Sequence, residues 1–192
     1  MSSHQGENAT LRSIMQQSQA TLLRRYPLGE TSWIVVWCTA EHGLVRTAAR
    51  GARLPKSALA GKLDLFFEAE IAWINARRSD LHALREVLLL SPRMGLRQSY
   101  ARTVAAAYFA ALLEQVVETE TPIPEFHDLL VRALDWLSDH EPVPAAIKRY
   151  EDRIAELLGI GVAGVASAGA LLDTFHKLPP QRQILFEHIF RS

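Results

Sequence analysis

Apolar and polar residues alternate over residues 19–90 with the two-residue period of β-strands. The clearest case is the segment from Leu63 to Trp73, in which every second residue is apolar and acidic residues lie between them. The segment Ser32–Thr39 is instead apolar on both faces, which is typical of a strand that is covered on both sides. This part of the chain is therefore expected to be a β-domain.

Short turn signals separate the predicted strands. Pro27 and Gly29 predict a turn over residues 26–29, because proline presets φ at the second turn position and glycine relieves the fourth. The loop at residues 41–43 predicts a hairpin to Leu44–Arg50, and residues 81–90 fit either a fifth strand or a short helix. Five short strands with one long loop favour a small closed barrel over a flat sheet, because closure removes exposed strand edges.

The period changes to that of a helix after Ser91-Pro92. Apolar residues from Phe126 to Leu137 recur at i, i+3, i+4, i+7, i+8 and i+11, and weaker stripes run over residues 100–117 and 147–158. Prolines separate these helices, and a last short helix is expected after Pro179-Pro180. The pattern predicts an α+β chain with a polar tail (residues 1–14), a β-barrel (residues 15–90) and an all-α helical domain (residues 91–192).

The charge is balanced overall but unevenly distributed. The 192 residues include 21 Lys and Arg against 21 Asp and Glu, which excludes a uniformly basic nucleic-acid-binding protein. Residues 1–103, however, hold 14 basic and 8 acidic side chains, a net charge of +6, whereas residues 104–192 hold 7 and 13, a net charge of −6. This asymmetry predicts a basic binding module joined to an acidic one.

The composition excludes several other classes. Cys38 is the only cysteine, so the chain forms no internal disulfide and no thiolate zinc cluster. The N-terminal residues lack the apolar core of a secretory signal, and the weakly polar stretch Gly159–Leu172 is too short to span a bilayer. We expect a cytoplasmic, nucleoid-associated protein with no membrane partner.

No catalytic motif stands out. Residues 159–164 match the G-x-G-x-x-G pattern of dinucleotide sites, but that fingerprint needs a preceding strand, and here a predicted helix precedes it. The chain has no G-x-S-x-G, H-E-x-x-H or Walker motif, and no two histidines lie three or four residues apart. We therefore expect no catalytic residue, metal or cofactor; a nucleotide-dependent enzyme that uses the glycine run is the least favoured alternative.

The most informative segment is residues 42–63, which holds five cations and no acid: Arg46, Arg50, Arg53, Lys56 and Lys62. Its glycines and proline indicate a loop, so these cations face either solvent or phosphates. Because all five charges are positive, the segment favours a nucleic-acid partner. Arg24-Arg25 and Arg77-Arg78 add positive charge from neighbouring strands. Four aromatic residues offer a platform for stacking bases, although each fits the barrel core better: Trp33, Trp37, Phe66 and Trp73.

Three sequence blocks carry a family resemblance. Leu23–Ser32, Glu41–Val45 and Ala49–Ser57, in this order and spacing, are similar to the N-terminal domain of the bacterial recombination mediator family RecO, and "ARGARLPKS" after "EHGLV" is its most specific part. Arg149–Gly159 resembles a helix of the same family, so the resemblance covers nearly the whole chain from Met15. It implies an OB-fold barrel followed by a helical domain, in agreement with the pattern above.

The resemblance also implies a non-enzymatic role in DNA repair and homologous recombination. Such proteins bind single- and double-stranded DNA, anneal complementary strands coated with single-strand-binding protein (SSB), and act with RecR to assist the loading of RecA. The implied DNA-binding positions are Arg24, Arg25, Arg46, Arg50, Arg53 and Lys56, to which the loop adds Lys62. The alternative is an OB-fold adaptor that mainly contacts proteins and binds DNA weakly.

Two further expectations concern the helical half. The family binds the acidic, apolar C-terminal tail of SSB there, and Arg97 and Arg102 beside Tyr100 are the candidate contact. Many relatives also carry a four-cysteine zinc module after the resembling helix, but here Val162–Ala170 takes its place and holds no cysteine. We therefore expect a metal-free variant of the family whose basic loop is unchanged.

Overall fold

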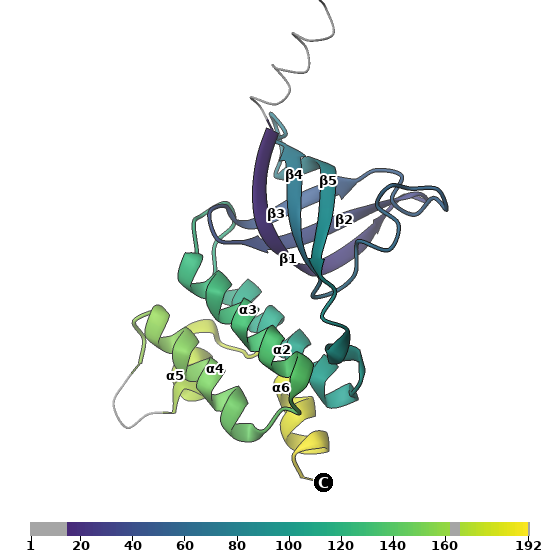
Figure 1. Cartoon of the computed structure of the whole chain (residues 1–192). Coiled ribbons are helices and arrows are strands. Elements are labelled where there is room, and N and C mark those ends of the chain that lie inside the picture. The colour runs from purple at the N-terminus through teal and green to yellow at the C-terminus, as the bar shows by residue number, and fades with distance from the viewer. Residues whose placement is uncertain (1–14, 162–165, 192) are drawn as a thin grey trace, which may run out of the picture. The chain divides into compact units, whose positions relative to one another are not determined.

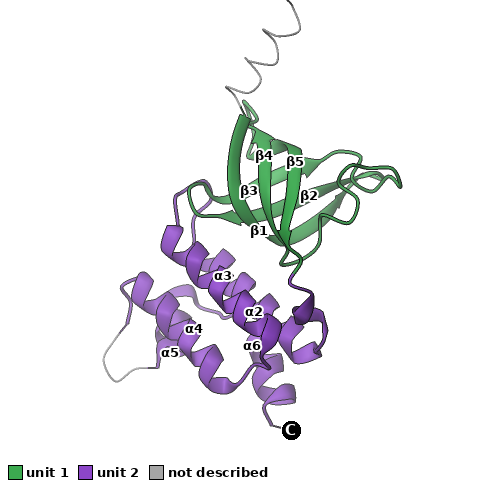
Figure 2. Ribbon diagram, in the orientation of Figure 1, with its two compact units in different colours: residues 1–92 green, residues 93–192 purple. Residues whose placement is uncertain are grey.

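The computed structural model describes residues 15–161 and 166–191. It divides into two compact units, residues 1–92 and residues 93–192 (Figures 1 and 2). The first unit holds five strands and the second holds the helices, so the α+β class with the barrel first is confirmed. The predicted N-terminal tail lies outside the described residues.

The first unit is a closed barrel with the strand order β1-β2-β3-β5-β4. The strands are β1 (Met15–Leu28), β2 (Ser32–Thr39), β3 (Gly43–Ala49), β4 (Glu68–Ile74) and β5 (Leu81–Ser91). All neighbours pair antiparallel except β3 and β5, whose short parallel ladder completes the barrel. The alternation in β4 places Ala69, Ile71 and Trp73 in the core, and residues 81–90 form the fifth strand.

The turn expected over residues 26–29 is wrong, because β1 continues through it. Tyr26 pairs with Ile34 and Pro27 pairs with Trp33, and the chain reverses only over residues 29–31. Strand β1 pairs with β4 only from Met15 to Thr21, so in the described sheet Pro27 has a ladder partner on one side alone. A strand tolerates proline at such an edge because no second ladder needs its missing N–H group.

The strand expected from Leu63 begins later, at Glu68. Phe66 has a φ of +66°, which lies outside the strand region, and therefore interrupts the alternation. The backbone N–H of Phe66 donates to the Leu22 carbonyl at 2.8 Å, and the Phe67 carbonyl accepts from the Leu22 N–H at 2.9 Å. These bonds attach the end of the long loop to β1 before β4 starts.

The second unit consists of η1 (Met94–Arg97), α2 (Tyr100–Val116), α3 (Pro124–Asp139), α4 (Pro144–Leu157), α5 (Ser167–Phe175), α6 (Gln181–Ile184) and η2 (Leu185–Ile189). Prolines open α3 and α4, where their missing N–H groups have no helical acceptor. The predicted α3 stripe is confirmed, since Leu130, Leu134 and Leu137 are fully buried. No described helix is long and apolar enough to cross a membrane.

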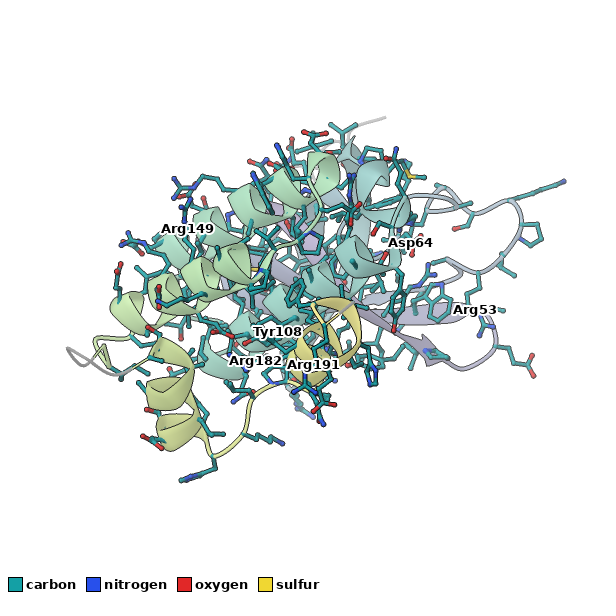
Figure 3. The ribbon with its side chains drawn as sticks, turned by 90° about the horizontal axis from the view of Figure 1, so that it is seen from below. Arg53, Asp64, Tyr108, Arg149, Arg182 and Arg191 are labelled. Carbon is teal, nitrogen blue, oxygen red and sulfur yellow. The ribbon has the colours of Figure 1, made fainter. Side chains whose placement is uncertain are left out.

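A buried polar cluster joins three helices of this unit. Glu151 of α4 is 2% exposed and accepts hydrogen bonds from the Tyr108 hydroxyl of α2 at 2.7 Å and from Arg182 Nε of α6 at 2.6 Å (Figure 3). Burial, followed by the nearby Glu151 charge, raises the pKa of Tyr108. The cluster compensates a charge that would otherwise be costly to bury.

Candidate nucleic-acid interface

The basic segment is an ordered loop between β3 and β4. Successive i to i+3 backbone hydrogen bonds fold residues 49–62 into tight turns. The loop is attached to the β1–β2 turn, because the Gly51 N–H donates to Ser32 Oγ at 3.1 Å and the Arg53 N–H donates to the Thr31 carbonyl at 2.9 Å. Gly51 has a φ of +66°, a conformation that favours glycine. The loop cations are therefore presented from a defined backbone.

Arg50, Arg53 and Lys56 are exposed on this loop, and within the described residues none of them forms an ion pair. Arg53 Nη1 donates only to the Gly29 carbonyl, at 3.2 Å, and the residue lies at the loop end of the barrel unit (Figure 3). Lys62 is half-buried, and its Nζ donates to the Val87 carbonyl of β5 at 3.1 Å. Within the described residues, no carboxylate neutralises any of these four side chains.

Arg24 and Arg46 lie on strands of the barrel rather than on the loop. Both are in register with Val36, Arg24 from β1 and Arg46 from β3, so they lie in one row on the outer face of the barrel. Arg46 forms an ion pair with Asp80, and its hydrogen bond and positive charge lower the pKa of the Asp80 carboxyl. Arg46 thus contributes less net charge than the sequence suggests. Its partner lies 34 residues away, beyond the acid-free segment.

Arg25 is brought next to the loop at the end of the barrel. A bulge between Leu22 and Arg24 shifts the register, and Arg25 then pairs with Val35, a core residue. Its guanidinium donates to the Leu63 carbonyl and lies 3.2 Å from a carboxylate oxygen of Asp64. The guanidinium carbons of Arg25 and Arg53 lie 5.1 Å and 4.9 Å from the ring centroid of Trp33, within cation–π range.

Only one of the four candidate stacking residues is accessible. Trp37 and Trp73 are fully buried and Phe66 is 5% exposed, as expected of core residues, whereas Trp33 is half-buried. Beside Trp33 is a cavity of about 180 Å³ lined by Arg25, Trp33, Ala52, Leu59, Gly61, Leu63, Asp64 and Phe67. We call it the Trp33 pocket. Asp64 also lines it but lies one residue beyond the acid-free segment, so the run of cations gives no signal for this carboxylate.

Comparison with known proteins identifies the family. The family model described as "Recombination protein O N terminal" matches residues 15–105, and "Recombination protein O C terminal" matches residues 97–169. The chain belongs to the RecO family. The predicted resemblance is thereby confirmed: the N-terminal match contains the whole described barrel, and the C-terminal match contains α2, α3 and α4.

Several relatives are named "DNA repair protein RecO". The protein from Cyanothece sp. is 34% identical over 140 residues, which cover 72% of this chain and 47% of the relative. The protein from Anaeromyxobacter sp. strain K is 34% identical over 130 residues, which cover 68% of this chain and 51% of the relative. The protein from Aliivibrio fischeri strain MJ11 is 30% identical over 150 residues, which cover 78% of this chain and 61% of the relative. The matched region thus spans about half to three fifths of the length of these RecO proteins.

Neither a metal centre nor a dinucleotide loop is found in the part of the chain that the structure describes. No group of three or more His, Cys, Asp or Glu side chains there is placed to hold a metal ion. Cys38 is buried, and its burial raises the pKa of the thiol to about 12. The glycine run follows α4 rather than a strand, and its residues 162–164 lie outside the described residues. The residues present do not fit a four-cysteine zinc site.

The candidate contact for an acidic tail is only partly available. Arg102 Nη1 donates to the Ser138 carbonyl at 2.8 Å, and its Nε pairs with Glu141 at 2.8 Å, so its guanidinium caps the end of α3. An acidic partner would have to compete with Glu141 for Arg102, and the contact stays a prediction. Tyr100, in contrast, is 69% exposed at the start of α2.

Proposed function

We propose that this chain binds single- and double-stranded DNA through the loop end of its barrel and anneals complementary strands during DNA repair and recombination. The observation that carries the proposal is the ordered loop with four charged residues that have no carboxylate partner in the described structure: Arg50, Arg53, Lys56 and Lys62. The relatives named "DNA repair protein RecO" support a role in DNA repair. We further propose that it works on SSB-coated strands with RecR, assists RecA loading indirectly, and catalyses no covalent step.

The charge distribution suggests how annealing would proceed. Two DNA strands repel each other through their phosphates, and lysine and arginine side chains that neutralise phosphates reduce this repulsion. Arginine matches two phosphate oxygens at once, whereas lysine acts as a compact point charge. Because these contacts do not read the bases, most Watson–Crick edges stay available for pairing while both strands are held.

The experiment compares two double charge reversals that change the net charge equally. Arg50→Glu/Lys56→Glu alters the loop, and Arg149→Glu/Lys177→Glu alters exposed cations of the helical unit. We expect the loop variant to lose at least about tenfold in affinity for single-stranded DNA, since each lost charged hydrogen bond costs about 1.5–3 kcal/mol. The control variant should bind like the wild type.

Fluorescence anisotropy measures the affinity, and strand annealing of SSB-coated oligonucleotides, with and without RecR, measures the activity. The loop variant should anneal slowly in both cases. If it binds and anneals like the control, the loop is not the DNA surface. If the wild type and both variants all bind weakly and do not anneal strands, the adaptor interpretation replaces the proposal.

A further inference from the structure

We propose that the Trp33 pocket holds one unpaired nucleobase of bound single-stranded DNA and prefers a base with an amino group. This inference rests on the proposed function and adds a base-binding subsite to a surface that otherwise contacts phosphates. Three features of the pocket carry it: an accessible indole, a cavity of suitable size and a carboxylate where a phosphate-binding site would have only cations.

The indole is the first feature. Trp33 packs against the barrel core yet stays half-buried, unlike Trp37 and Trp73, which are 0% and 1% exposed. Arg25 and Arg53 both lie over its ring, at 5.1 Å and 4.9 Å. Bases stack on aromatic rings and on guanidinium planes, so this group offers flat surfaces of both kinds. Its position next to the cationic loop places these surfaces beside the expected path of the phosphates.

The size of the cavity is the second feature. The Trp33 pocket measures about 180 Å³, and its lining is mostly polar, with Leu59 and Leu63 adding some apolar surface. By size alone, a cavity of about 150 Å³ holds one benzene ring, whereas drug-sized ligands need about 300 Å³ or more. The pocket therefore suits a single flat ring system, such as one nucleobase, rather than a whole nucleotide.

The carboxylate is the third feature. Asp64 lines the pocket, pairs with Arg25 at 3.2 Å and accepts the Leu65 N–H at 2.9 Å. Its negative charge disfavours a phosphate inside the pocket, while each carboxylate oxygen can accept more than one hydrogen bond. Cytosine, adenine and guanine carry an exocyclic amino donor, whereas the one ring donor that unpaired thymine offers, N3–H, lies between two carbonyl oxygens that a carboxylate repels. The pocket should accordingly prefer cytosine to thymine, because Asp64 accepts from the cytosine amino group.

The test uses three fluorescent oligonucleotides with the same number of phosphates: one fully abasic, one with a single central cytosine and one with a single central thymine. We expect the wild type to bind the cytosine probe about 5- to 150-fold more tightly than the abasic probe, the range for stacking of one base. The affinity for the thymine probe should lie between the affinities for the other two. Equal binding of all three probes would overturn the base pocket and leave the phosphate surface intact, whereas no binding of any probe would overturn the proposed function itself.

Two carboxylate variants separate the pocket from general electrostatics. Asp64→Asn and Asp80→Asn each release an arginine from an ion pair and change the net charge equally, but only Asp64 lines the Trp33 pocket. The cytosine-to-thymine affinity ratio should approach one in Asp64→Asn and stay at the wild-type value in Asp80→Asn. A ratio that is unchanged in Asp64→Asn, or lost equally in both variants, contradicts the role of Asp64.

Fluorescence gives a readout that needs no disruptive change in the barrel. In a Trp136→Phe protein, Trp33 is the only tryptophan that is not fully buried, because Trp37 and Trp73 lie in the core. The cytosine probe at saturation should quench this fluorescence, since stacking brings the base against the indole, and the abasic probe should not. Equal quenching by both probes would show that the base does not reach Trp33.

Discussion

The proposed DNA binding has a salt dependence that the ion pairs of the barrel predict. The sequence places five cations on residues 42–63, but Arg46 is paired with Asp80. The cations proposed to neutralise phosphates are therefore the other four: Arg50, Arg53, Lys56 and Lys62. Each phosphate neutralised on a single strand contributes about −0.7 to the slope of log K against log salt. Four contacts give a slope of about −2.8, and five would give about −3.5.

The difference is large enough to measure. Between 50 mM and 200 mM salt, a slope of −2.8 lowers the affinity ~50-fold and a slope of −3.5 lowers it ~130-fold. Asp80→Asn should change the slope from the first value to the second, because it removes the carboxylate partner of Arg46. Wild type should therefore show the shallower slope and Asp80→Asn the steeper one.

The assay is anisotropy of a labelled single-stranded oligonucleotide at several salt concentrations. Asp128→Asn is the matched control, because it releases Arg132 from an ion pair in the helical unit. Its slope should equal that of the wild type. A wild-type slope near zero would refute phosphate neutralisation by the loop, and a slope unchanged by Asp80→Asn would refute the argument that Asp80 masks Arg46.

Three further predictions concern stability and reactivity. Gly95→Ala should lower the free energy of unfolding by about 1–3 kcal/mol, because the new Cβ would lie 2.0 Å from the Ser138 carbonyl oxygen; an unchanged urea midpoint would contradict this overlap. Arg182→Met should lower the free energy of unfolding by about 3 kcal/mol, because the buried Glu151 loses its cation. Arg182→Lys should lower it less in the same urea titration. Burial raises the Cys38 pKa to about 12, so iodoacetamide should modify this thiol only after denaturation; rapid labelling of the native protein would show that it is accessible.

The period of apolar residues predicted the two units well. Strand alternation identified Ala69, Ile71 and Trp73 as core, and helical spacing identified the buried leucines of α3, because both patterns are local consequences of which face is buried. The errors arose where tertiary context overrides a local signal. Pro27 is typical of a turn, yet it lies within β1. Strand β2 still pairs with this part of β1, and β4 no longer does, so no second ladder needs the missing N–H group of the proline.

The candidate surface was predictable only in outline. A run of like charges between glycines and a proline located the loop, since this signal is contained in one short segment. The partners of Arg25 and Arg46 were not predictable, because Asp64 and Asp80 meet them only through the bulge in β1 and the parallel ladder between β3 and β5.

The location of the DNA is the central claim, and amide hydrogen exchange tests it most directly. Exchange of the whole chain is measured with and without a saturating single-stranded oligonucleotide. The account predicts slower exchange over residues 50–63 and around Trp33, with little change in α4. Slower exchange confined to the helices, with the loop unaffected while DNA is bound, would contradict it.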